Sequence, residues 1–131
     1  MPNTEVRVFQ DSEGKSEFNE WLVATVRRRK LRSKCLAMIF QLASHGNELR
    51  RPSADFLRDG VYELRFKYSN VNYRILYGFI GRSIALVSHV TTKLDKVANK
   101  DIDIAVQRLM AAKKSPETYT VEFDIPNGEN P

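Results

Sequence analysis

The spacing of hydrophobic positions changes several times along the chain, and each change predicts a new element. Apolar and polar residues alternate over residues 5–9, which predicts a short strand. Between residues 16 and 46, apolar residues recur every three or four positions, which predicts two amphipathic helices joined as a hairpin or as one kinked helix. Ser16 is placed to cap the first helix, and Gly46 to end the second.

Alternation returns in the second half of the chain and predicts an antiparallel meander. Its three strands are expected at residues 61–68, 71–80 and 83–92, with turns at residues 69–70 and 81–82. Because alternate side chains lie on opposite faces of a sheet, the apolar set of each strand should face the helices. In the third strand this set is Ile84, Leu86, Ser88 and Val90. The outward set then includes Glu63, Arg65, Lys67, Arg74, His89 and Lys93.

The remaining segments complete a single α+β domain. Residues 47–60, with Pro52 and the Asp59-Gly60 pair, are expected to form a loop, and helical spacing resumes over residues 100–112. The order β-α-α-β-β-β-α indicates an antiparallel sheet with helices packed on one face and the other face open. The domain should occupy residues 1–116. Residues 117–131 form an acidic tail, which is either disordered or adds a strand at residues 119–125.

Charge makes the open face a candidate binding surface. The 131 residues include 21 Lys and Arg against 16 Asp and Glu, and residues 117–131 hold four of the acids and no basic residue. Residues 1–116 therefore carry a net charge of +9, which attracts polyanions, nucleic acid first and an anionic membrane surface second. A second basic group is expected at the junction of the two helices, with Arg27, Arg28, Arg29, Lys30, Arg32 and Lys34.

The cysteines and histidines of the chain limit the disulfides and metal sites that it can form. A single cysteine, Cys35, excludes an intramolecular disulfide framework and a CxxC metal site, and it fits a cytoplasmic protein. The two histidines, His45 and His89, lie far apart and show no spacing typical of metal ligands. We therefore expect no metal and no other cofactor. No apolar run reaches the length needed to cross a bilayer, so no membrane-spanning segment is expected, and we expect no membrane partner.

Three motifs in the meander carry a family resemblance. They are Tyr62-Glu63-Leu64-Arg65, Tyr73-Arg74-Ile75-Leu76-Tyr77 and the segment from His89 to Lys96, His-Val-Thr-Thr-Lys-Leu-Asp-Lys, before an amphipathic helix. Residues 59–112 resemble the RelE/HigB toxin superfamily, and the HigB-like branch with phage-derived relatives is most similar. The predicted β-α-α order upstream agrees with the fold of that superfamily.

The resemblance implies a type II toxin that cleaves messenger RNA in the ribosomal A site. Such a metal-independent endoribonuclease uses the 2′-OH of the RNA as nucleophile and leaves a 2′,3′-cyclic phosphate. In this chemistry Arg65 and Arg74 would stabilise the phosphorane-like transition state. Glu63 or His89 would act as the base, and Lys93 or Lys96 as the acid. Lys67 and the basic group at the helix junction would contact RNA.

The same resemblance implies partners and leaves two other functions open. The partners would be the messenger RNA, the ribosome and a cognate antitoxin, which in the HigB-like branch usually carries a helix-turn-helix domain, as in HigA. One alternative is a ParE-like inhibitor of DNA gyrase, which shares the fold. The other is a non-catalytic nucleic-acid-binding protein or decayed toxin, favoured by Thr92 and Ala98, where the branch usually has Lys and Pro.

Overall fold

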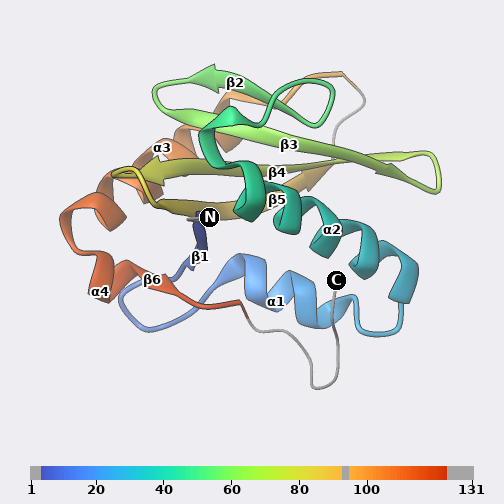
Figure 1. Ribbon diagram of the computed structural model, residues 1–131. Coiled ribbons are helices and arrows are strands. Elements are labelled where there is room, and N and C mark those ends of the chain that lie inside the picture. Colours follow the sequence, from blue (N-terminus) through green and yellow to red (C-terminus); the bar gives the residue numbers. More distant parts are fainter. Residues whose placement is uncertain (1–3, 93–94, 124–131) are drawn as a thin grey trace.

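The structure is a computed structural model that describes residues 4–92 and 95–123 (Figure 1). Within these residues, six strands form one sheet: β1 Glu5–Phe9, β2 Ala54–Arg58, β3 Val61–Tyr68, β4 Val71–Ile80, β5 Ile84–Thr92 and β6 Thr120–Val121. The helices are α1 Glu17–Ala24, α2 Arg29–His45, α3 Asn99–Lys114 and α4 Pro116–Tyr119, and a short 3-10 turn covers Gly46–Glu48. The α+β class is confirmed.

The sheet is mixed, because β1 runs parallel to one neighbour. The strand order is β2-β3-β4-β5-β1-β6, with β1 parallel to β5 and antiparallel to β6. The prediction of a fully antiparallel sheet is therefore wrong. Alternation within a strand shows which residues share a face, but it carries no signal for the direction of the strand beside it.

Helices α1 and α2 cover one face of the sheet and bury the larger core. Phe18, Leu22 and Leu42 pack there with Leu64 and Ile75 of the central strands. Both predicted helix ends are confirmed. The Ser16 side chain accepts a hydrogen bond from the Asn19 backbone N–H at 3.2 Å. Gly46, at φ 55°, follows the last residue of α2 in a conformation that favours glycine.

Helix α3 covers part of the opposite face, so the helices do not all lie on one side as predicted. Val61 and Leu76 pack under Ile102, and Leu86 packs under Leu109. Val61 alternates in phase with Glu63, and Leu76 with Arg74, so the alternation rule predicts that both apolar side chains face solvent, which is wrong. A sheet covered on both faces has apolar residues on both sides of its central strands, which alternation alone does not reveal.

A β-bulge at Ser88 reverses the two faces within β5. Leu76 pairs with His89 while the next residue, Tyr77, pairs with Val87, so Ser88 is an extra residue in β5. Before the bulge, Ala85 and Val87 join the core under α1 and α2 while Leu86 faces α3, opposite to the prediction. After the bulge the prediction is confirmed for Val90, which packs against the α1–α2 core.

Two strands lie in segments that were expected to be a loop or a tail. Residues 47–60 were expected to be a loop, but they contain β2, which pairs with β3. Asp59 and Gly60, both at positive φ, form the hairpin turn between these strands. At the other edge, β6 adds Thr120–Val121 to β1, within the segment where a strand was one of the two expectations. Residues 124–131 of the acidic tail lie outside the described residues.

Candidate active site

Two arginines face each other across the central hairpin. Arg65 of β3 and Arg74 of β4 are register partners, and their side chains lie on the face of the sheet that α3 only partly covers. Arg74 is largely buried, with 10% of its side chain exposed, and Arg65 is half-buried at 34%. Like charges directly opposite each other destabilise a sheet. The pair therefore has a cost in stability that a bound anion would remove.

The carboxylate of Glu63 lies beside both arginines. Its Oε1 is 3.2 Å from Arg74 Nε, and its Oε2 is 3.7 Å from Arg65 Nε. Glu63 is 6% exposed, and this burial raises its pKa above the ordinary value, although Arg74 and Arg65 act in the opposite direction. The result is a shielded carboxyl group held against two guanidinium groups, with a raised affinity for a proton.

Arg74 also contacts the loop between β5 and α3. Its Nη2 donates a hydrogen bond to the backbone carbonyl of Asp95. Its Nη1 is buried, and no hydrogen-bond acceptor for it occurs among residues 4–92 and 95–123. A buried guanidinium N–H without an acceptor is costly, and a phosphate oxygen would satisfy it. This arrangement suits an anion that binds beside Arg74.

Glu63, Arg65 and Arg74 form an arginine cluster with a fourth member, Asp55, which was not predicted from the sequence. It lies on β2, where its Oδ2 is 2.7 Å from Arg51 Nη2 and 3.7 Å from Arg65 Nη2. The hydrogen bond from Arg51 lowers the pKa of Asp55, so its carboxylate stays charged and orients Arg65. The Asp59-Gly60 pair before the alternating segment was the available signal, because such a pair commonly closes a hairpin and so implies a strand before it.

A cleft of about 740 Å³ opens next to Glu63. It lies between the β2–β3 turn and the first turn of α3, and both Glu63 and the exposed Lys96 line it. The structure thus brings one predicted acid and one predicted base to the same cleft. Lys93, the other predicted acid, lies outside the described residues. Lys67 is exposed near the end of β3.

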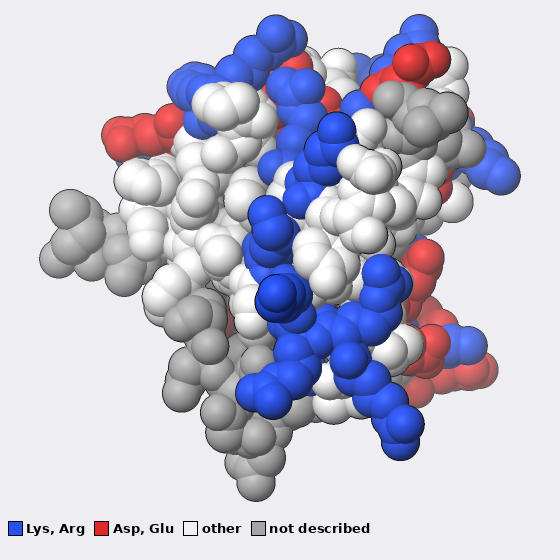
Figure 2. Space-filling model, turned by 90° about the vertical axis from the view of Figure 1, so that its right-hand side faces the viewer, with Lys and Arg blue, Asp and Glu red and all other residues white. Residues whose placement is uncertain are grey.

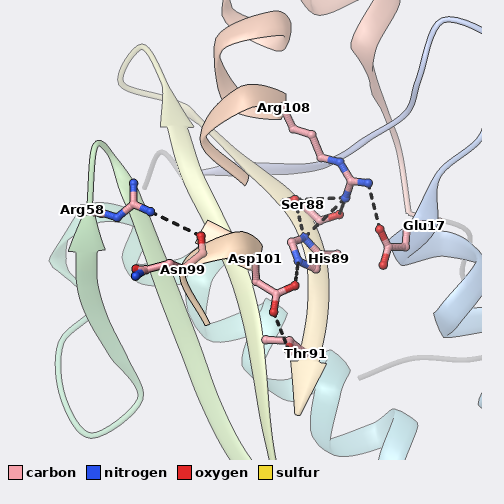
Figure 3. Close-up of polar contacts among 8 residues, drawn as sticks. All are labelled: Glu17, Arg58, Ser88, His89, Thr91, Asn99, Asp101 and Arg108. Carbon is pink, nitrogen blue, oxygen red and sulfur yellow. Dashed lines mark hydrogen bonds and ion pairs between the residues drawn. The ribbon is translucent and has the colours of Figure 1, made fainter. Parts of the chain in front are cut away.

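His89 is in a separate, buried network under α3 (Figure 3). It is 3% exposed, with Ser88 Oγ 2.7 Å from Nδ1 and Asp101 Oδ1 3.1 Å from Nε2. Arg108 extends the network by donating to the Ser88 carbonyl and to Glu17. A carboxylate at Nε2 and a hydroxyl at Nδ1 favour the tautomer with its proton on Nε2. Both ring nitrogens therefore have partners away from the Glu63 carboxylate.

Lys and Arg side chains gather in a band on the side that carries the α1–α2 junction and the tip of the β3–β4 hairpin (Figure 2). The predicted binding residues exposed in these segments are Arg27, Arg28, Arg29, Lys30, Lys34 and Lys67. Arg32 is an exception, because it is 2% exposed and its Nη2 donates to the Val26 carbonyl at 2.7 Å. The prediction that Arg32 binds RNA at the surface is therefore corrected: it fastens the α1–α2 junction.

The described residues contain neither a cluster of metal ligands nor a membrane-spanning helix. Within residues 4–92 and 95–123, no three His, Cys, Asp or Glu side chains come together as a metal site would require. None of the helices in the same ranges combines the length and the apolar character needed to cross a bilayer.

Comparison with protein families assigns the chain to a class. Residues 26–110, about two thirds of the chain, match the family described as phage-derived protein Gp49-like (DUF891). The chain belongs to this family, whose members are RelE/HigB-like toxins. The resemblance of the three motifs in the meander is thereby confirmed. A comparison with curated proteins finds no match.

Proposed function

We propose that this toxin-family protein is a ribosome-dependent messenger RNA endonuclease. The observation that carries the proposal is the placement of Arg65 and Arg74 opposite each other with the buried Glu63 carboxylate beside them. Guanidinium groups match phosphate oxygens in bidentate geometry and stay charged at every relevant pH. Two of them on adjacent strands form a receptor for one phosphodiester, with a proton acceptor within reach.

The proposed reaction is transesterification by the RNA itself. The 2′-oxygen attacks the neighbouring phosphorus, the bond from phosphorus to the 5′-oxygen breaks, and the products are a 2′,3′-cyclic phosphate and a 5′-hydroxyl. Charge on the non-bridging oxygens increases in the transition state, and Arg65 and Arg74 stabilise that charge.

Two proton transfers complete the reaction. Glu63 takes the proton from the 2′-OH, and burial suits it to this step because it raises the pKa of the carboxyl toward neutrality. Lys96, which lines the same cleft, donates a proton to the departing 5′-oxygen. We prefer Glu63 to His89 as the base because His89 is 3% exposed and both of its ring nitrogens have partners.

The exposed basic residues supply the contacts to the ribosome in this proposal. Arg27 to Lys30 and Lys34 are exposed at the α1–α2 junction, and Lys67 is exposed near the hairpin tip. They form a surface for the phosphates of ribosomal RNA, which presents the messenger to the cleft. A toxin of this class also requires an antitoxin, and we propose a small helix-turn-helix protein as that partner.

The products and the substrate test the proposal. We expect wild-type protein to cut messenger RNA in ribosomal complexes with a vacant A site and to leave 5′-hydroxyl ends. Replacing the ribose at the cut position by 2′-deoxyribose should abolish that cut, because the nucleophile is removed. Free RNA is the control for ribosome dependence. Ribosome binding without any cut would refute the nuclease, and inhibition of DNA supercoiling by gyrase would favour the ParE-like alternative.

A further inference from the structure

The cleft beside Glu63 extends well beyond the groups that the proposed cleavage chemistry uses. Its volume of about 740 Å³ is within the range of small-molecule sites in proteins. Leu57 of β2 and Val97, Ala98 and Ile102 at the start of α3 give it apolar walls. Val97 and Ile102 are themselves buried in the core under α3, so these walls are backed by packed side chains.

Polar groups are placed at the rim of this cleft. Arg58 joins its two sides, with Nη2 2.7 Å from Asp103 Oδ1 of α3 and Nη1 3.1 Å from Asp59 Oδ2 in the β2–β3 turn. Asn99, the first residue of α3, also lines the cleft, and its backbone carbonyl accepts from Arg58 (Figure 3). The structure records no hydrogen bond by the Asn99 side-chain amide within the ranges it describes. That amide offers donors and an acceptor to a ligand.

Apolar walls with an amide at the rim match the chemistry of a nucleobase. Proteins that bind single-stranded RNA sandwich unstacked bases between apolar or aromatic side chains and hydrogen-bond their edges. Glu63 belongs both to the arginine cluster and to the lining of the cleft, so the two are continuous. A strand with one phosphate at Arg65 and Arg74 therefore has a neighbouring base next to the cleft.

We propose that the cleft formed by Leu57, Val97, Ala98, Asn99 and Ile102 holds an unstacked base of the cleaved RNA, beside the scissile phosphate. This inference rests on the proposed nuclease function and adds a site that selects where the strand is cut. The apolar walls select a base by its shape, and the Asn99 amide forms hydrogen bonds with the edge of that base. The cleft, rather than the arginines, would then set any base preference.

Two variants with matched controls test the inference. Asn99→Ala removes the amide at the rim, and Gln107→Ala removes an exposed amide elsewhere on α3. Ala98→Leu fills the cleft from a position whose extended backbone, φ −69° and ψ 144°, accepts leucine. Ala37→Leu adds the same bulk at an exposed position of α2. Urea unfolding of each variant establishes that it is folded. Cuts are mapped on a messenger library of random sequence in ribosomal complexes.

We expect Asn99→Ala to reduce base preference at one position beside the cut by about threefold to tenfold, as loss of one hydrogen bond would. Ala98→Leu should slow cleavage by about tenfold on ordinary messages. On a message with an abasic residue at that position, it should cut as fast as wild type. Both controls should behave as wild type.

Two results would overturn the inference and are distinguishable. If wild-type protein cuts while Asn99→Ala keeps the wild-type base preference and Ala98→Leu keeps the wild-type rate, the cleft binds no base and the nuclease proposal stands. If wild-type protein makes no cut, the proposed function fails and the base site fails with it.

Discussion

Arg65 and Arg74 occupy directly opposite positions on β3 and β4, which places two permanent positive charges at one point of the sheet. Glu63 compensates them only in part, because one buried carboxylate with a raised pKa faces two guanidinium groups. Residues selected for stability alone would pair opposite charges at such a position. The arrangement is typical of a site that is completed by an anionic ligand.

Loss of the Arg65 guanidinium should therefore affect cleavage far more than stability. Arg65 is 34% exposed, and its carboxylate partners are both 3.7 Å away, so Arg65→Gln should change the free energy of unfolding by less than about 0.5 kcal/mol. Cleavage by the same variant should fall by about 100-fold or more. Urea unfolding and cleavage rates measure the two effects. A stable variant with wild-type activity would remove Arg65 from the site.

The raised pKa of Glu63 predicts a pH dependence with a definite sign. The folded protein holds the proton on Glu63 more tightly than the unfolded chain, whose carboxyl titrates near 4.5. The contribution of Glu63 to stability is therefore full below pH 4.5 and is lost as the pH rises through the raised value. Relative to Glu63→Gln, wild-type protein should lose stability over that interval, as measured by urea unfolding at successive pH values.

Cleavage should show the opposite trend over the same interval. A base works only when deprotonated, so the wild-type rate should rise with pH until Glu63 is ionised. Glu63→Gln should be slower by about 100-fold or more and should lack this rise. A pH profile that is unchanged in Glu63→Gln would assign the base to another group.

His89 and Asp101 are expected to act on stability more than on chemistry. The contact of Asp101 with His89 and Thr91 fastens the first turn of α3 to β5. His89→Asn should lower the free energy of unfolding by about 1 to 3 kcal/mol, because Asp101 loses a buried partner. His45→Asn is the matched control at an exposed position. The cleavage rate of folded His89→Asn should stay within about tenfold of wild type, and loss of cleavage in a stably folded variant would instead support His89 as the base.

The exposed basic residues should bind the ribosome in a salt-dependent way. Each cation that contacts a phosphate contributes about 0.7 to 0.9 to the slope of log affinity against log salt concentration. Replacing Arg28 and Arg29 together by alanine should therefore reduce the slope by about 1.4 to 1.8. Arg82→Ala, in the turn at the other end of β4, should leave it unchanged. An unchanged slope in the double variant would remove these residues from the contact.

The sequence predicted local elements well and their assembly less well. Periodicity located the helices from Ser16 to Gly46 and the β3–β4 hairpin, because these depend on neighbours along the chain. It could not show that β1 runs parallel to β5 or that α3 covers the second face, because both depend on distant contacts. The bulge at Ser88 left no signal in the spacing, and one extra residue was enough to reverse half of β5.

In the candidate site, too, residues on neighbouring strands were predicted, whereas residues placed by distant contacts were not. The alternation rule and the family motifs together located Glu63, Arg65 and Arg74, since the three lie on one face of adjacent strands. They did not separate His89 from this cluster, because its burial depends on α3, including Asp101. Asp55 was missed with β2, whose short run lies between a proline and a hairpin turn. Residues brought in by another element need the tertiary structure to be found.

The nuclease function of the arginine site is tested most directly by primer extension on a defined messenger RNA in ribosomal complexes, with wild-type protein, Arg74→Lys and Arg82→Lys. Both substitutions keep the charge and remove the planar fork, the first at the site and the second in the exposed β4–β5 turn. We predict cuts by wild type and Arg82→Lys only where ribosomes are present, and a loss of about 100-fold in Arg74→Lys. Equal cutting by Arg74→Lys would show that the guanidinium of Arg74 is not needed for cleavage, and no cutting by wild type would show that the protein is not this nuclease.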